Sequence, residues 1–194
     1  MSTILCMKHS QAGLSMLECL VAVAVMAILT VLAVPGFRDL LVRRAVLVTA
    51  EALVGDLRFA RSEAIKRGSP VSMCRSADGS TCSGAGDWVE GWIVFVDRNT
   101  KGVVDPGDEV LRVQSRQPQL ASIANGSNGS NGSNGSTGTD KASFSFLPTG
   151  MSGPATQTFK LTPVAPVPSN SERVVCVSLQ GRPRLAPPGA SSCS

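Results

Sequence analysis

The sequence predicts an α+β protein in which one long N-terminal helix precedes an antiparallel β-sheet head. Two patterns in the chain support this prediction. Residues 14–37 are predominantly apolar and carry one charge, Glu18, and a run of this length can cross the hydrocarbon core of a bilayer as a helix. After residue 69, the helical spacing gives way to short segments rich in Val, Ile, Phe and Thr, separated by turn residues. A helix followed by a series of strands is typical of the α+β class.

An amphipathic continuation of the helix is predicted over residues 38–68. Apolar residues recur there at steps of three and four, which places them on one face that can pack against a sheet. This predicted stripe consists of Leu41, Ala45, Val48, Ala52, Leu53, Leu57, Ala60 and Ala64. Most basic residues of the segment should face elsewhere. Gly68, with Pro70 shortly beyond, is expected to end the helix.

Residues 69–194 are predicted to form a β-rich globular head. Its predicted strands are 70–75, 91–97, 109–113, 142–147, 157–162 and 173–179. Trp88, Trp92 and Phe95 are expected to pack in the core or on a sheet face rather than to bind a ligand. Four Asn-Gly-Ser triplets follow one another over residues 125–136 and offer no apolar side chain to bury. Residues 125–139 are therefore expected to form a flexible loop.

Charge is distributed unevenly along the chain. The net charge is +4, yet residues 110–194 alone carry seven basic and two acidic residues, a net charge of +5. This basic C-terminal part favours an anionic partner.

An enzymatic activity is not expected. The only histidine, His9, precedes the apolar run, so the rest of the chain lacks the usual general base and the commonest metal ligand. No glycine-rich phosphate loop follows a predicted strand, which removes support for nucleotide hydrolysis. The sequence therefore predicts a structural or binding protein without a cofactor.

Four of the six cysteines lie beyond the apolar run. They are Cys74, Cys82, Cys176 and Cys193, and they allow three pairings. In an oxidising compartment disulfides are expected, and the simplest pairing joins neighbours along the chain, Cys74–Cys82 and Cys176–Cys193. A four-cysteine zinc site is the rival interpretation. It is disfavoured because the sequence has no Cys-x-x-Cys spacing, so no metal is predicted.

A short motif opens the apolar run, Gly13-Leu-Ser-Met-Leu-Glu18. It resembles the processing site of type IV pilins and pseudopilins. The resemblance implies that residues 1–13 form a leader, that prepilin peptidase cleaves after Gly13, and that Leu14 becomes the methylated amino terminus. The family usually has Phe at the position of Leu14, and leucine keeps its bulk and polarity. An ionised carboxylate in an apolar run is costly without a partner, and the resemblance implies that Glu18 pairs with the terminal amine of a neighbouring subunit in the fibre.

Three further segments carry a resemblance to the FimT, FimU and GspH branch of these pilin-like proteins. They are Ser-Glu-Ala-Ile-Lys-Arg-Gly at 62–68, Val-Ser-Met-Cys at 71–74 and Gly-Trp-Ile-Val-Phe-Val-Asp at 91–97. The resemblance implies the type IV pilin fold, with major and minor pilins as partners. It also implies a single-pass protein of the inner membrane with its head in the periplasm, which later enters an extracellular pilus.

The last predicted strand leads into Gly181-Arg182-Pro183-Arg184. Glycine permits a tight turn and proline fixes the backbone between two arginines, so a semi-rigid loop could present both guanidinium groups. Arginine forks match phosphate oxygens, and without aromatic residues in this tail to stack bases, contact with a duplex backbone is favoured. Arg173 and Lys160 are possible helpers. The alternative is a solvated edge strand whose charges discourage aggregation.

The Gly-Arg-Pro-Arg segment is also similar to a Gly-Arg-x-Arg motif of FimT-type pilins that bind DNA during natural transformation. The leading expectation is therefore a minor type IV pilin, incorporated at or near the pilus tip, that binds extracellular double-stranded DNA through Arg182 and Arg184. Two alternatives stay open: a FimU-like minor pilin that primes pilus assembly without binding DNA, and a GspH-like pseudopilin of a type II secretion system.

Overall fold

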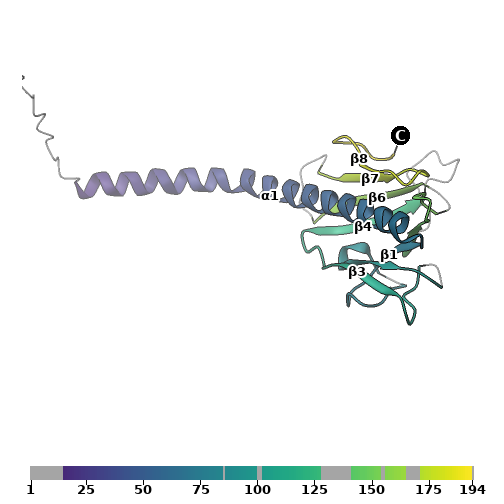
Figure 1. The fold of residues 1–194 in the computed structure, drawn as a ribbon. Coiled ribbons are helices and arrows are strands. Elements are labelled where there is room, and N and C mark those ends of the chain that lie inside the picture. Colours follow the sequence, from purple (N-terminus) through teal and green to yellow (C-terminus); the bar gives the residue numbers. More distant parts are fainter. Residues whose placement is uncertain are drawn as a thin grey trace, which may run out of the picture. The chain divides into compact units, whose positions relative to one another are not determined.

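The computed structural model describes most of the chain. The described residues are 15–84, 86–99, 102–127, 141–153, 156–164 and 171–193. In these residues, helix α1 (Met16–Arg67) precedes eight strands and one short 3-10 helix, η1 (Trp88–Glu90) (Figure 1). The chain divides into two compact units, one ending at Arg38 and the other beginning at Asp39.

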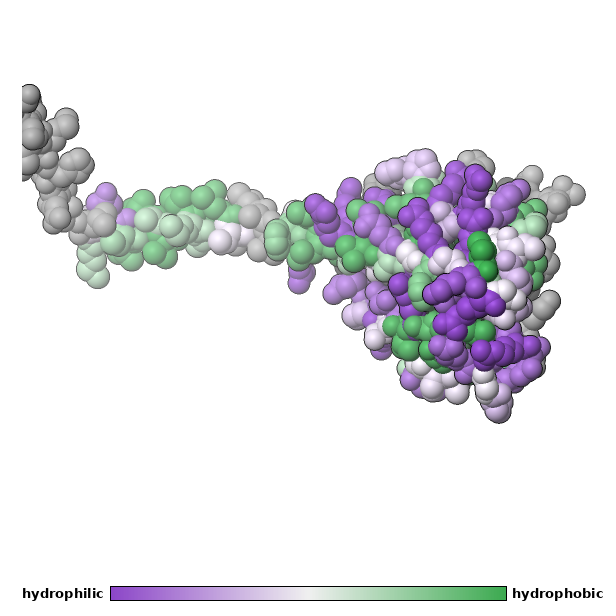
Figure 2. All heavy atoms as spheres, viewed as in Figure 1, coloured by the Kyte–Doolittle hydropathy of each residue, from purple (hydrophilic) through white to green (hydrophobic). Residues whose placement is uncertain are grey.

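The first unit contains the start of α1. Ser15 precedes the helix and accepts a hydrogen bond from the backbone N–H of Glu18 at its hydroxyl oxygen, with an N–O distance of 3.3 Å. Large apolar side chains of this part are exposed, Met16 and Leu20 among them, and Figure 2 shows hydrophobic residues along it. Within the described residues, no helix is long and apolar enough to cross a membrane.

The second unit holds two antiparallel four-stranded sheets. Sheet A has the strand order β3-β2-β1-β5. It consists of β1 (Val71–Arg75), β2 (Trp92–Val96), β3 (Glu109–Gln114) and β5 (Ser143–Phe146). Sheet B has the order β4-β6-β7-β8. It consists of β4 (Leu120–Ser127), β6 (Gln157–Pro163), β7 (Arg173–Val177) and β8 (Pro183–Leu185). The α+β class and all six predicted strands are confirmed.

Strand β4 overturns part of the predicted flexible loop. The first Asn-Gly-Ser triplet ends β4, where Asn125 pairs with Phe159 and is 1% exposed. Pairing with β6 gives these backbone groups hydrogen-bond partners, which a composition-based prediction does not consider. The rest of the predicted loop, residues 128–139, lies outside the described residues.

Strand β8 corrects the prediction that the Gly-Arg-Pro-Arg segment is a loop. Pro183–Leu185 pairs antiparallel with β7, with Arg184 opposite Cys176. Proline is tolerated at the first residue of an edge strand because its missing N–H is not needed by the sheet. A strand of three residues is too short to produce a recognisable alternating pattern.

The part of α1 after Arg38 packs on both sheets through one apolar face. Its buried residues are Val46, Ala50, Leu53, Val54, Leu57, Ala60 and Ala64. They share one core with Val94 of sheet A and Phe159 of sheet B. Trp88, Trp92 and Phe95 are buried, as predicted.

The predicted stripe on α1 is wrong in its first half. Leu41 and Val48 are exposed, by 53% and 61%, whereas Val46 and Ala50 are fully buried. At 3.6 residues per turn, Leu41 and Val48 lie about 140–180° around the helix from Val46 and Ala50, on nearly the opposite face. The sequence is compatible with either apolar face. The buried face is the one that Val46 and Ala50 share with Leu53 and Leu57, because this face packs on the sheets.

A second, polar face of α1 forms hydrogen bonds with sheet A and with the segment that follows β3. Thr49, Asp56 and Glu63 recur every seven residues, and all three are buried. The Thr49 hydroxyl donates to Oε1 of Gln117 at 3.0 Å. Asp56 accepts at Oδ2 from the Trp92 indole N–H at 2.9 Å and at Oδ1 from Arg112, at an N–O distance of 2.8 Å.

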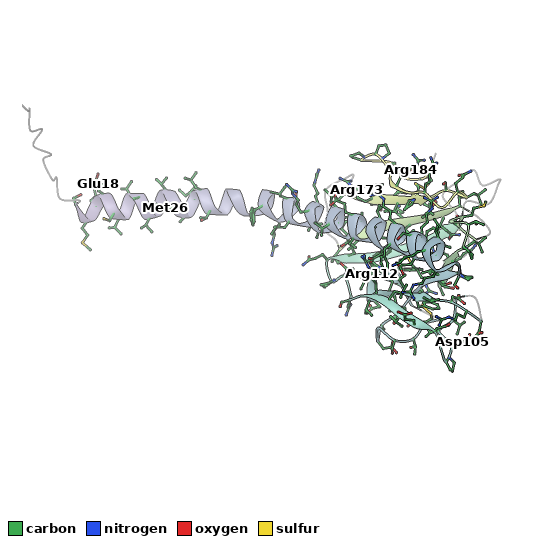
Figure 3. All side chains as sticks on the ribbon, in the orientation of Figure 1. Glu18, Met26, Asp105, Arg112, Arg173 and Arg184 are labelled. Atoms are coloured by element: carbon green, nitrogen blue, oxygen red, sulfur yellow. A yellow bond between two sulfur atoms is a disulfide. The ribbon has the colours of Figure 1, made fainter. Side chains whose placement is uncertain are left out.

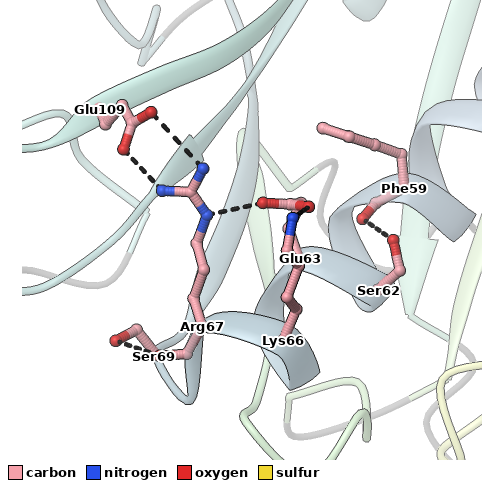
Figure 4. Close-up of polar contacts among 7 residues, drawn as sticks. All are labelled: Phe59, Ser62, Glu63, Lys66, Arg67, Ser69 and Glu109. Atoms are coloured by element: carbon pink, nitrogen blue, oxygen red, sulfur yellow. Dashed lines mark hydrogen bonds and ion pairs between the residues drawn. The ribbon is translucent and has the colours of Figure 1, made fainter.

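Arg67 completes this polar face at the end of α1. Its Nε donates to Glu63 and its Nη1 to Glu109 of β3, each at 2.6 Å (Figure 4). The hydrogen bond from Arg67 lowers the pKa of Glu63, and the hydrogen bonds to Glu109 and Glu63 raise the pKa of Arg67. Both shifts favour the charged forms, so the bridge between helix and strand is kept at neutral pH.

Two disulfides join neighbouring cysteines along the chain. Cys74 of β1 is bonded to Cys82, and Cys176 of β7 is bonded to Cys193. These are the two local pairs that the spacing favours. The second disulfide holds the C-terminal tail against sheet B, where Ala186 packs with Cys176.

Candidate functional site

The C-terminal hairpin that joins β7 to β8 is the candidate site. Its turn is closed by two backbone hydrogen bonds, from Gly181 N to Ser178 O at 2.8 Å and from Ser178 N to Arg182 O at 3.2 Å. Gly181 adopts a φ of +70°, a left-handed conformation that glycine enters without strain. The Arg182 N–H also points to the Ser178 hydroxyl oxygen, at 3.3 Å. The backbone on both sides of Arg182 is therefore fixed.

This turn lies against a second turn and against α1. A Cβ at position 181 would collide with the carbonyl oxygen of Gly150 and would lie 3.2 Å from Nε of Arg61. The same Gly150 oxygen accepts a hydrogen bond from Arg61 Nε at 2.9 Å. Ser152 adds two hydrogen bonds to the hairpin, from its N–H to Leu179 O and from its hydroxyl to Ser178 O. Three segments that are far apart in the sequence meet at this point.

A basic hollow, which we call the α1–β8 groove, opens between the helix and the hairpin. Its volume is about 380 Å³. The groove is lined by Arg58, Arg61, Ser62 and Ile65 of α1 and by Arg182 and Pro183 of the hairpin. Arg58 and Arg182 are exposed, and Arg61 is half-buried. Across the described ranges, none of these three arginines forms an ion pair, so the groove carries three positive charges that no protein carboxylate neutralises.

The predicted DNA-binding residues do not form a single cluster. Arg182 lines the groove. Arg184, labelled in Figure 3, lies on β8, where it is paired with Cys176 of β7. Lys160 pairs with Val174 across β6 and β7, and Val174 and Cys176 lie on the same face of sheet B because they are two residues apart. Lys160 and Arg184 therefore share this outer face, away from the core that includes Val175.

The two predicted helper residues are already engaged. Lys160 forms an ion pair with Glu172, with an N–O distance of 2.9 Å. Arg173 begins β7 and donates to the backbone carbonyl of the same Glu172 at 2.9 Å. Any phosphate contact by Lys160 would have to compete with this carboxylate.

The predicted processing and assembly residues lie in or near the first unit. Gly13 and Leu14 fall outside the described residues. Glu18 is exposed in the first turn of α1, and its side chain has no ion-pair partner within the part of the chain that the structure describes.

Sequence reasoning missed the contribution of α1 to the groove. Arg58, Arg61, Ser62 and Ile65 are spaced i, i+3, i+4 and i+7, so they lie on one face of the helix. That spacing can be recognised in the sequence. The contact between this face and the C-terminal hairpin cannot, because it depends on sheet B and the Gly150 turn.

The fold resembles that of proteins whose structures have been solved. A type IV minor pilin, FimU of Pseudomonas aeruginosa PAO1, is similar at 20% sequence identity and a TM-score of 0.54, with 75% of this chain and 90% of FimU covered. The minor pseudopilin EpsH of the Vibrio cholerae type II secretion system is similar at 16% identity and a TM-score of 0.52, with 78% and 99% covered. A search of curated proteins gives no match. At these identities the likeness concerns the fold, which is that of pilin-like proteins.

Two family profiles match the sequence itself. The prokaryotic N-terminal methylation motif matches residues 8–34, and the family described as type II transport protein GspH matches residues 49–181. The chain belongs to the GspH family and is a type IV pilin-like protein, a minor pilin or pseudopilin. The GspH match ends at Gly181, so it does not cover Arg182 or Arg184.

Proposed function

We propose that this chain is a minor type IV pilin that binds extracellular double-stranded DNA through its C-terminal hairpin during natural transformation. The observation that carries the proposal is the position of Arg182, exposed in a groove with two other arginines that form no ion pair with any described residue. Arg184, exposed on β8, supplies a second contact from the outer face of sheet B. Arginine binds phosphate oxygens through two parallel hydrogen bonds, and this contact does not depend on base sequence.

The proposal includes the maturation that the methylation motif supports. Prepilin peptidase cleaves between Gly13 and Leu14, and the new terminal amine is methylated. Membrane anchoring is part of the proposal and rests on the sequence: the apolar run of residues 14–37 would hold the subunit in the inner membrane, with the head in the periplasm, although no described helix is long and apolar enough to cross a membrane. Glu18 then pairs with the terminal amine of another pilin as the subunit enters the pilus at or near its tip.

A second candidate function is that of a pseudopilin in a type II secretion system. The GspH match over residues 49–181 favours it, because this family is described by type II transport. In that case the hairpin arginines would serve contacts with other pseudopilins. A priming pilin that does not bind DNA would give the same negative result in a binding experiment.

DNA binding by the full-length chain in nonionic detergent tests the proposal. Anisotropy of a labelled duplex would be measured for the wild type and for the variant Arg182→Ala, Arg184→Ala over a series of salt concentrations. The wild type is expected to bind, with an affinity that falls as salt rises, and loss of two phosphate contacts should reduce the salt slope by about 2.

The matched control is the variant Arg43→Ala, Arg44→Ala. It removes the same number of charges from two exposed residues of α1 outside the groove. Binding of this control should resemble that of the wild type. A wild-type chain that fails to bind the duplex even at low salt would rule out the DNA-binding proposal and leave the pseudopilin and priming functions.

A further inference from the structure

We infer that the α1–β8 groove is a phosphate-binding site in which helix α1 supplies two of the three guanidinium groups, from Arg58 and Arg61. The inference rests on the proposed DNA binding and specifies how one backbone phosphate is held. It assigns a function to two helix residues that lie about 120 positions before the hairpin arginines in the sequence. The occupant is a phosphodiester of the DNA backbone.

The side chain of Arg61 and the backbone of Arg182 are held in position before any ligand binds. The Nε of Arg61 donates to Gly150 O, and among the described residues Arg61 makes no other hydrogen bond, so its terminal nitrogens are left for a ligand. Arg182 follows a turn fixed by Ser178 and Gly181. Fixing these groups in advance lowers the conformational entropy lost on binding.

Arg58 is the third donor and lies one turn before Arg61 on the same face of α1. It is exposed and has no ion pair in the described segments, so it can turn toward an anion in the groove. Ile65 and Pro183 add apolar contacts to the lining. Contact between an anion and guanidinium groups is stronger where apolar groups reduce access of water.

The charge of the groove identifies phosphate as the ligand. Three guanidinium groups that form no ion pair with a described carboxylate offer more donors than a single carboxylate can accept. A phosphodiester presents two non-ester oxygens that share one negative charge and two ester oxygens, and the volume of about 380 Å³ leaves room for its flanking sugars. An acidic side chain of a neighbouring subunit is the competing occupant, and the experiments below distinguish the two.

Charge reversal at Arg58 tests the inference in the full-length chain. Arg58 makes no described hydrogen bond, so Arg58→Glu should leave the fold intact, which thermal unfolding by circular dichroism would verify. We expect binding of the labelled duplex to weaken at least about tenfold at physiological salt, and the salt slope to fall by about 1.

The control Arg44→Glu makes the same change of charge on the same helix. Arg44 lies 14 residues before Arg58, or about 21 Å along the helix axis, which is beyond the screening length at physiological salt. We expect Arg44→Glu to weaken binding less than about threefold. One outcome would separate the inference from the proposed function: the wild type binds DNA, Arg182→Ala weakens this binding, and the two glutamate variants bind equally well. In that case the proposed DNA binding is supported and the proposed role of α1 is wrong. If the wild type does not bind at all, the proposed function has failed and the inference fails with it.

Chemical protection gives a test without variants. Phenylglyoxal modifies accessible arginines, and mass spectrometry of the wild-type chain would report each site with and without duplex DNA. Arg58, Arg61 and Arg182 should be protected together, and Arg44 should not. Equal modification of Arg58 and Arg61 with and without bound DNA would overturn the inference. Protection by polyglutamate that equals protection by DNA would assign the groove to acidic protein partners instead.

Discussion

Gly181 is a single residue on which the shape of the groove depends. Its positive φ turns the hairpin, and its missing side chain leaves room for the Gly150 carbonyl that orients Arg61. The glycine in the Gly-Arg-Pro-Arg segment therefore contributes to the site through packing, in addition to the tight turn that the sequence predicted.

We predict that Gly181→Ala destabilises the protein by about 2–4 kcal/mol, because it adds a backbone collision to the strain of a positive φ. Gly189→Ala is the matched control, since Gly189 has a φ of +83° and open space where a Cβ would lie. It should cost only about 1 kcal/mol. Urea unfolding followed by circular dichroism measures both, and equal losses would show that the contact with Gly150 does not matter.

Asp56 joins α1 to two strands of sheet A through its hydrogen bonds with Trp92 and Arg112. We predict that Asp56→Ala costs about 2–3 kcal/mol, because the buried indole N–H of Trp92 loses its acceptor. Arg112 would also lose its carboxylate, although its guanidinium stays 3.8 Å above the Phe59 ring. The exposed residue Glu51 provides the control, and Glu51→Ala should change the stability by less than about 0.5 kcal/mol. A similar small effect of both substitutions would contradict this role of Asp56.

Helix α1 presents different faces to different parts of the head. One face carries the apolar core residues, a second carries Thr49, Asp56 and Glu63, and a third carries Arg58 and Arg61. The two polar faces explain why sequence reasoning on this helix was incomplete. The basic residues were expected mostly to face away from the sheet, and no partner was predicted for Thr49, Asp56 or Glu63, since nothing local distinguishes a partnered polar side chain from an exposed one.

The loop closed by the Cys74–Cys82 disulfide is a second element with a definite prediction. Asp78 accepts hydrogen bonds there from the hydroxyl and N–H of Thr81, from the N–H of Ser80 and from Ser76. These bonds, led by that from the Thr81 hydroxyl, hold the pKa of Asp78 well below its ordinary value of 3.8. A lowered pKa in the folded state means that the ionised form stabilises the fold above pH 3.8 and that this contribution disappears as the pH falls toward the folded-state pKa.

We therefore predict that Asp78→Asn lowers the stability at neutral pH and that the difference from wild type shrinks below pH 3.8. Urea unfolding of both proteins across this range measures the difference. Asp39→Asn, at an exposed residue of α1 without a described hydrogen bond, is the control and should show no such trend. A difference for Asp78→Asn that is constant with pH would mean that these hydrogen bonds do not depend on the charge.

Much of the fold of the whole molecule could be predicted from the sequence. The helix ends at Arg67 before a glycine of positive φ, and the six predicted strands are present because their patterns are local. Strands β4 and β8 were missed because their residues become strands only by pairing with β6 and β7. The site was predicted only in part for the same reason. Arg182 was recognised from its neighbours in the chain, whereas Arg58 and Arg61 reach it only after the sheets have formed.

The central claim is that Arg182 acts together with α1 rather than with Arg184 at one phosphate. A double-mutant cycle for DNA binding by the full-length chain measures this most directly, with Arg58→Ala, Arg182→Ala and Arg184→Ala singly and in pairs. We predict a coupling of at least about 1 kcal/mol between Arg58 and Arg182, and additivity within about 0.5 kcal/mol for Arg182 and Arg184. Additive effects of Arg58 and Arg182, with strong coupling between Arg182 and Arg184, would contradict the claim.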